Sequence, residues 1–287
     1  MVWLTNQQIG TWKRKRILVG SLLICWLILM FFTPKVPLHS FRHHVFADKR
    51  NFMAGVPNTL NVMTNFPFLI IGVLGFVLCL GGSFFNISLK GEIWGWTLFY
   101  ASVSSLAFGS AYYHLKPDDN RIVWDTLPIL IAYSSLFSSF LVERAGERVG
   151  LSCLVLLLFI SVFSVAYARQ VQIEVIICVL VDGRVFNDLR LCLTFQLIPC
   201  LVIPVMTVLL PPKYTHSRFW LLATAAHAVS KIEGLADSKI YNFNGYTISG
   251  HSLGHLCSAL AMVLLTVMLL YRSIRFPSRL SELKGHP

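Results

Sequence analysis

Long apolar runs dominate the chain, and short polar connections separate them. Eight runs are long enough, or nearly so, to cross a lipid bilayer as helices: 17–32, 58–80, 93–114, 122–142, 150–168, 190–210, 218–236 and 251–271. A spanning helix needs about 20 apolar residues, so the first run lies at the short limit. The pattern predicts an all-α membrane protein, because helices satisfy their own backbone hydrogen bonds in lipid.

Composition agrees with this prediction. The chain has 287 residues, of which 55% are hydrophobic and 13% charged, and its mean hydropathy is +0.67. A soluble domain of this size has too little interior to hide so much apolar surface. The net charge of +11 is scattered over short loops and tails. Orientation in the membrane explains that charge better than nucleic-acid binding does.

The basic residues also predict an orientation. The block Lys13–Arg16 precedes the first run, and no small-residue cleavage site follows it, which favours an uncleaved signal anchor with a cytosolic N-terminus. Eight crossings return the basic tail, which begins with Arg272 and Arg275, to the cytosol. An endoplasmic reticulum or Golgi membrane is the expected location. The predicted domains are a basic segment, anchor helix and linker at 1–44, a helical bundle at 45–272, and a cytosolic tail at 273–287.

Five polar residues near helix ends are candidates for chemistry. His251 and His255 stand four apart at the start of the last run, so a helix places both on one face. Taken alone, the pair also fits two histidines that meet lipid headgroups. Far upstream, Ser110 and His114 end one run and Asp125 begins the next, and the predicted topology puts all five at the non-cytosolic end. Polar groups in spanning helices are costly and usually face the bundle interior.

The residue types indicate what such a site does. Three imidazoles without thiolates suit Zn²⁺ and leave a fourth position open for water. Zinc makes bound water acidic and polarises a carbonyl group. Asp125 can accept the proton of that water and deliver it to a leaving group, or it is only a first-turn or capping carboxylate. Ser110, one turn before His114, can bind an oxyanion or orient a ligand. No G-x-S-x-G turn favours it as a nucleophile.

Further polar residues fall at the same predicted end and are candidates to support the site. These are Asn61, Asn65, Arg190, Lys231 and Glu233. Arg190 alone, like Asp237, also fits a helix-end residue at headgroup depth. His227 lies nearer the middle of its run, as either a packed neutral imidazole or a partner of the site.

The motif set resembles a known superfamily. S-x3-H, an Asp eleven residues later and H-x3-H in the last run are similar to the CREST superfamily of seven-helix membrane hydrolases, and within it to the alkaline ceramidases. Stretches at 48–62, 112–118, 122–128, 187–190 and 249–255 resemble a plant and bacterial branch. The resemblance covers about residues 45–272. It implies a seven-helix transmembrane bundle, to which the first run adds one N-terminal helix.

The resemblance also implies an activity. Zinc would be held by His114, His251 and His255, with Asp125 as the acid/base or water-orienting residue and Ser110 beside them. The substrate would be a ceramide- or phytoceramide-like membrane lipid, cleaved to a sphingoid base and a fatty acid. Two alternatives stay open. One is a non-catalytic, progestin-receptor-like receptor or scaffold with a structural metal, and the other is a related hydrolase of lipid esters.

Two departures from the family stand out. Animal-type alkaline ceramidases carry an acidic segment that binds calcium, but here Lys49 and Arg50 follow Asp48, and Asn58 stands where a Glu is expected. Calcium needs several oxygen ligands, so these residues argue against calcium. The link at 169–186 is also longer than usual. It contains an apolar run at 173–181 that fits either an interfacial strand or an insertion.

Overall fold

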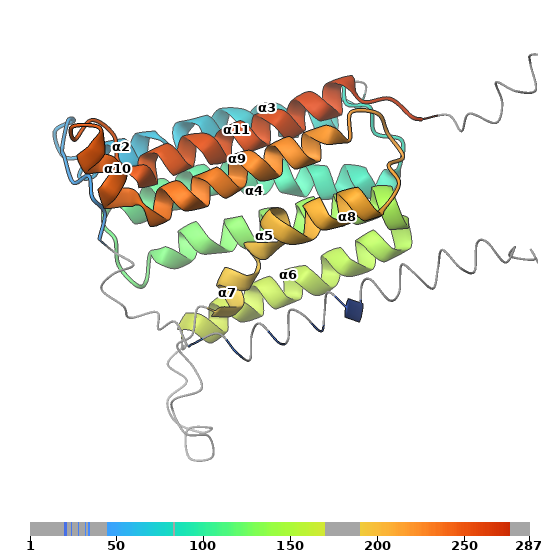
Figure 1. Ribbon diagram of the computed structural model, residues 1–287, viewed down its shortest axis with the longest axis horizontal. Coiled ribbons are helices and arrows are strands. Elements are labelled where there is room, and N and C mark those ends of the chain that lie inside the picture. The colour runs from blue at the N-terminus through green and yellow to red at the C-terminus, as the bar shows by residue number, and fades with distance from the viewer. Residues whose placement is uncertain are drawn as a thin grey trace, which may run out of the picture.

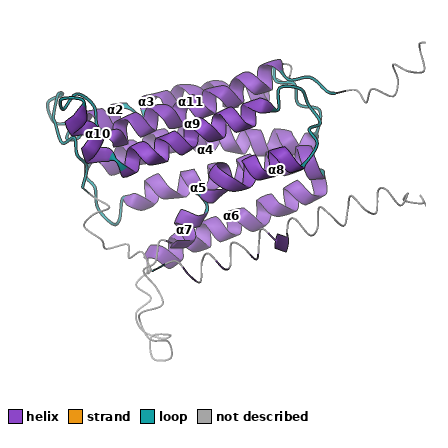
Figure 2. Cartoon of the chain, in the orientation of Figure 1, coloured by secondary structure: helices purple, strands orange, loops and turns teal. Residues whose placement is uncertain are grey.

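The structure is a computed structural model that describes residues 45–82, 84–169 and 190–275, with six isolated positions between 20 and 34. In chain order the helices are α2 Thr59–Met63, α3 Phe66–Leu80, α4 Lys90–Leu115, α5 Ile122–Ala145, α6 Glu147–Arg169, α7 Arg190–Thr194, the π-helix η2 Ile198–Val202, α8 Ile203–Leu209, α9 Arg218–Leu235, α10 Asp237–Phe243 and α11 Gly250–Tyr271. Figure 2 shows helices and loops and no strand in this part of the chain. The all-α prediction is confirmed for the described residues.

The long helices lie side by side along one axis (Figure 1). α4 packs against α3 and α5, α11 packs against α9 and α3, and α5 packs against α6. The bundle therefore has two ends. We call one the histidine end, which holds α2, α10, the α4–α5 connection and the start of α11. The other, here the opposite end, holds the α3–α4 and α8–α9 connections and the end of α11.

Within the described residues, five helical stretches are long and apolar enough to cross a membrane. They are Thr59–Leu80, Ile122–Ala145, Glu147–Ala166, Cys192–Leu209 and Gly250–Tyr271. α4 and α9 have comparable lengths, 26 and 18 residues, and pack among them. Their glycine, serine and charged residues make them less apolar. The chain thus has the helices of a membrane protein.

Two runs predicted as single helices are broken, so those predictions were wrong in detail. Over 58–80, α2 ends at Met63 and α3 begins at Phe66, with Pro67 in its first turn. Over 190–210, α7, η2 and α8 follow one another, with a proline at the start of each of the last two. Proline lacks the N–H of a continuing helix but fits a first turn. The predictions for 17–32, 173–181 and most of the two terminal segments lie outside the described residues.

The helices that carry the polar residues approach each other closely. At Gly109 in α4, an added Cβ would overlap the carbonyl oxygen of Trp124 in α5, so only glycine allows this contact. Deeper in the bundle, Ser138 of α5 donates to the Gly150 carbonyl of α6 at 2.9 Å. Small residues permit such close packing in membrane helices. The contact at Gly109 brings the next residue, Ser110, against the first turn of α5.

Candidate metal centre

The three histidines lie together at the histidine end. His114 ends α4, whereas His251 and His255 occupy the first two turns of α11, and their ligand atoms all lie within 4.8 Å of one another. The ring centroid of His114 lies 4.9 Å from that of His251 and 5.1 Å from that of His255. The residue pattern predicted that His114 and His251 lie together, although 137 positions separate them in the sequence.

The spacing of the ring nitrogens fits a metal ion. With metal–nitrogen bonds of about 2.0–2.1 Å, two ligands of a tetrahedral ion stand about 3.3 Å apart. Nε2 of His114 lies 3.3 Å from Nε2 of His251. His114 is buried, and its Nδ1 has no hydrogen-bond partner among the described residues. The group can therefore hold a metal ion, and its all-imidazole donor set suits zinc.

The Thr64 hydroxyl is a hydrogen-bond partner of the His255 ring. The Thr64 hydroxyl donates its single proton to the Leu60 carbonyl at 2.8 Å, and it lies 2.9 Å from Nδ1 of His255. When a metal takes the Nε2 lone pair of His255, Nδ1 carries the proton and can donate it to Thr64. Thr64 stands at the break between α2 and α3. Sequence reasoning missed Thr64 because it predicted an unbroken helix there.

Asp237 ties the start of α11 to the chain before α2. One carboxylate oxygen accepts from the backbone N–H of His251 and the other from that of Ala47, each at 2.8 Å. Ser249 caps the same helix by accepting from the N–H of Ser252 at 3.2 Å. Asp237 is thus more than the helix-end residue that its position alone allowed, because it holds the backbone of a candidate ligand.

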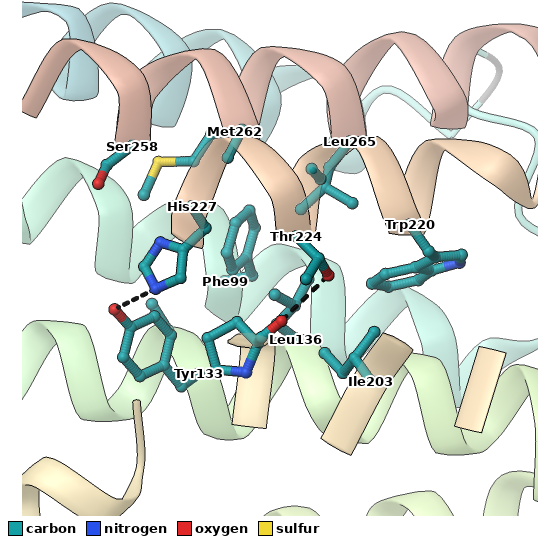
Figure 3. A pocket seen from close by; sticks show the side chains of 14 residues that line it. Phe99, Tyr133, Leu136, Ile203, Trp220, Thr224, His227, Ser258, Met262 and Leu265 are labelled. Carbon is teal, nitrogen blue, oxygen red and sulfur yellow. Dashed lines mark hydrogen bonds between the residues drawn. The ribbon is translucent and has the colours of Figure 1, made fainter. Parts of the chain in front are cut away.

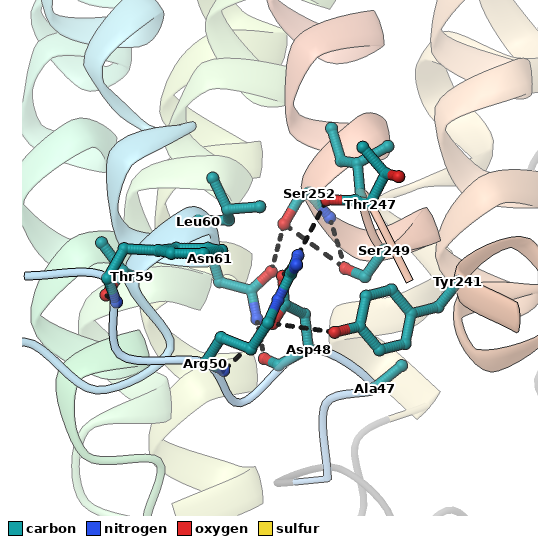
Figure 4. Close-up of polar contacts among 12 residues, drawn as sticks. Ala47, Asp48, Arg50, Thr59, Leu60, Asn61, Tyr241, Thr247, Ser249 and Ser252 are labelled. Carbon is teal, nitrogen blue, oxygen red and sulfur yellow. Dashed lines mark hydrogen bonds and ion pairs between the residues drawn. The ribbon is translucent and has the colours of Figure 1, made fainter. Parts of the chain in front are cut away.

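A segment that we call the strap, residues 46–50, covers the cluster. The Phe46 ring is buried, with its centroid 4.7 Å from that of His114 and 4.8 Å from that of His251. Arg50 donates to both oxygens of Asp48, at 2.9 and 2.7 Å, and to the Thr247 carbonyl at 2.8 Å (Figure 4). The guanidinium of Arg50 therefore fixes the strap to the loop before α11.

The Asp48 carboxyl is held ionised. Burial opposes its charge, but the hydrogen bonds and charge of Arg50, with a hydrogen bond from Tyr241, outweigh burial and place its pKa below the usual value. This pairing of Asp48 with Arg50 uses the carboxylate that a bound calcium ion would need.

Three asparagines in and beside α2 support the backbone around the site. Asn58 donates to the His114 carbonyl at 2.9 Å, and Asn61 accepts from the Ser252 hydroxyl at 2.5 Å. Asn65 donates to the Asn61 carbonyl at 2.7 Å, while its own side-chain oxygen has no partner among the described residues. These amides hold α2, α4 and α11 together and make no hydrogen bond to the imidazoles.

A cavity of about 390 Å³ opens beside the cluster. His251 and His255 line it, together with Ser110, Asp125 and Lys231. The Ser110 hydroxyl is hydrogen-bonded to the Asp125 carboxylate. Arg121, not Asp125, is the capping residue of α5, so the capping interpretation of Asp125 is wrong, although Asp125 does lie in the first turn. The cavity thus joins a hydroxyl–carboxylate pair to two of the three imidazoles.

Of the remaining candidate residues, some line the cavity and others do not. Lys231 lines the cavity, but Arg190 and Glu233 do not. Arg190 begins α7, which packs on α6, and Glu233 accepts from the Cys257 thiol at 3.5 Å. His227 is both packed and part of the site wall, since it is buried, lines the cavity and is bonded to the Tyr133 hydroxyl at 3.2 Å.

A narrow apolar space of about 40 Å³ continues from the cavity between α5, α9 and α11 (Figure 3). Tyr133, His227 and Met262 line both spaces. Farther along, Leu265 and Trp220 line the smaller space. The arrangement leads from polar groups at the histidine end to a largely apolar interior, which suits a ligand with a polar centre and a hydrocarbon tail.

Comparison with known protein families finds no match for the chain, and comparison with curated proteins finds none either. What the chain does is therefore inferred from its own residues and their geometry.

Proposed function

We propose that the chain is a zinc-dependent membrane hydrolase that cleaves the amide bond of ceramide-type lipids to a sphingoid base and a fatty acid. The observation that supports this most is that His251, His255 and the Ser110–Asp125 pair line one cavity, with His114 directly behind. The likeness of the motifs to alkaline ceramidases supplies the substrate class.

The residues divide the chemistry among them. A zinc ion held by the three histidines would supply an activated water and polarise the amide carbonyl. Asp125 would take a proton from the water as the new C–O bond forms and then deliver it to the amine nitrogen, after which the C–N bond breaks. The hydrogen bond from Ser110 keeps the Asp125 carboxylate aimed into the cavity. The apolar walls keep bulk water out.

In the proposed placement, α4 and α9 cross the membrane together with the five apolar stretches, which makes seven spans. Residues 17–32 would form an eighth span. The histidine end then faces the lumen of the endoplasmic reticulum or Golgi. A two-tailed lipid enters laterally and presents its amide at interfacial depth. A glycosylation reporter fused after Pro287 should stay unmodified, and its modification would place the site on the cytosolic side.

Two other functions are weaker. A receptor or scaffold with a structural metal needs neither Ser110 nor Asp125, yet both line the cavity. A hydrolase of lipid esters would use the same groups, so an ester analogue of the substrate belongs in the assay.

The first experiment measures zinc content and release of fatty acid from ceramide and phytoceramide by the purified protein. His114→Asn should lose both the metal and the activity. His216→Asn is the matched control: His216 lies in the α8–α9 connection with a φ of 58°, which asparagine tolerates. It should retain both. Activity that survives in the metal-free His114→Asn protein would discard the metal mechanism.

A second variant separates chemistry from metal binding. Asp125→Asn should keep its zinc and lose about 10²–10⁴-fold in turnover, because the proton acceptor is gone. Wild-type protein that binds zinc but cleaves neither amide nor ester would favour the receptor function.

A further inference from the structure

Lys231 is a cation inside the cavity with no role in the steps above. It projects from the last turns of α9 and lines the cavity with Asp125, His251 and His255. Among the described residues, its ammonium has neither a hydrogen bond nor a carboxylate oxygen within 4.0 Å. The cavity walls are mixed, with Ser110, Gln196 and Ser258 among the apolar residues, and the charge of Asp125 acts on Lys231 without a direct ion pair. An ammonium inside a helix bundle that lacks a direct partner is unfavourable, so this position indicates a ligand.

The balance of charge in the cavity gives the sign of that ligand. Asp125 is the only carboxylate among the described residues that line the cavity, and its single negative charge offsets the charge of Lys231. A divalent ion on the neutral imidazoles would add two positive charges to that of Lys231. The cavity then carries an excess of positive charge, which an anionic group would neutralise.

We propose that Lys231 binds the carboxylate of the fatty acid that amide cleavage releases, an inference that rests on the proposed function. Hydrolysis joins the water oxygen to the carbonyl carbon and moves one proton to the amine. The carboxylic acid then ionises at neutral pH. The uncharged amide offers Lys231 no charged partner, whereas the carboxylate does. The neighbouring apolar space, lined by Met262 and Leu265, receives part of the alkyl chain.

The test measures binding without turnover. The fluorescent fatty acid cis-parinaric acid and its methyl ester are titrated into the purified full-length protein, with zinc and after chelation. The acid should bind about tenfold more tightly than the ester, the ratio expected for one charge-assisted hydrogen bond. Lys231→Met should abolish this preference and leave ester binding unchanged. That unchanged binding also shows that the variant is folded.

Two further variants sharpen the test. Lys231→Arg keeps the positive charge and should keep the preference for the acid. Lys239→Met removes an exposed lysine of α10 and should behave as wild type. A preference that persists in Lys231→Met, or equal binding of acid and ester by wild type, would overturn the proposal.

A third titration examines the other anionic headgroup. Hexadecyl phosphate that displaces parinaric acid far better than palmitate would assign the subsite to a phosphate-bearing lipid, against the proposal. The readout is also independent of ceramide cleavage. A protein that binds the acid through Lys231 but does not hydrolyse ceramide contradicts the proposed function and leaves the anion subsite in place.

Discussion

Both ends of the bundle bury polar groups, but the two ends differ in whether those groups have partners. At the opposite end, Arg272 and Glu92 are almost fully buried, with 1% and 0% of their surfaces exposed, and they form an ion pair. At the histidine end, Nδ1 of His114 and the side-chain oxygen of Asn65 have no partners among the described residues. Only the histidine end adjoins the 390 Å³ cavity.

The opposite end is a network of matched charges and hydrogen bonds. Arg272 also donates to the Asn86 carbonyl at 2.9 Å and lies 3.9 Å from the Glu143 carboxylate. The Tyr214 hydroxyl donates to Glu92 at 3.0 Å. These contacts tie α4, α5, α11 and two connections together. The difference teaches that buried charge with its partner present is architecture, whereas unpaired buried polar atoms around the histidine cluster accompany a candidate site for a ligand.

The largest expected effect comes from breaking the matched network. Arg272→Met should lower the free energy of unfolding by about 3–5 kcal/mol, because it leaves Glu92 buried without its cation, whereas Glu143 keeps its ion pair with Arg144 at 3.1 Å. The measurement is chemical unfolding in detergent. Zinc content of the protein that stays folded should be unchanged, since the histidine end is far along the bundle.

Arg275→Met is the control for Arg272→Met. Arg275 is exposed, and its backbone N–H donates to the Lys213 carbonyl at 2.9 Å, a bond that the substitution keeps. Its removal should change stability little. Equal unfolding curves for the two variants would mean that the buried pair does not stabilise the fold.

The same contrast explains what the sequence could predict. Apolar runs predicted the helices, and the four-residue spacing of His251 and His255 predicted a shared face. Arg272 was expected in a basic cytosolic tail, because nothing local shows that it pairs with Glu92, 180 residues away. The hydrogen bond from the His251 backbone to Asp237 was not predicted for the same reason. Such partners depend on how the helices pack, and helical periodicity says nothing of that.

An intermediate effect is expected at the histidine end. Thr64→Val keeps the side-chain shape but removes the acceptor for the Nδ1 proton of His255. Zinc affinity should fall about 10–100-fold, as it does when the outer partner of a metal-bound histidine is lost. Competition with a chromophoric chelator measures this change.

Thr266→Val is the matched control for Thr64→Val. Its hydroxyl is bonded to that of Tyr100 at 2.8 Å, away from the cluster, so zinc affinity should not change. If both variants lost affinity equally, general loosening of the bundle would explain the loss. If neither did, the tautomer assigned to His255 would be wrong.

The smallest expected effect concerns the strap, where the histidine end does contain a paired carboxylate. Burial alone would raise the pKa of Asp48 above its ordinary value of 3.8. The hydrogen bonds and charge of Arg50, with a hydrogen bond from Tyr241, outweigh burial, so the folded-state pKa lies below that value. Its contribution to stability is therefore complete above about pH 4 and is lost as the pH falls through the folded-state pKa. The Arg50 side chain is 35% exposed, so solvent screening limits the contribution to about 1 kcal/mol.

Unfolding midpoints between pH 3 and pH 7 measure this contribution. The advantage of wild type over Asp48→Asn should be greatest at neutral pH and shrink toward pH 3, because a protonated Asp48 no longer pairs with Arg50. Asp118→Asn is the control, because Asp118 forms an ion pair with Arg121 at 3.5 Å in the α4–α5 connection. A constant gap between wild type and Asp48→Asn across this range would show that hydrogen bonding without charge holds the strap over the histidines.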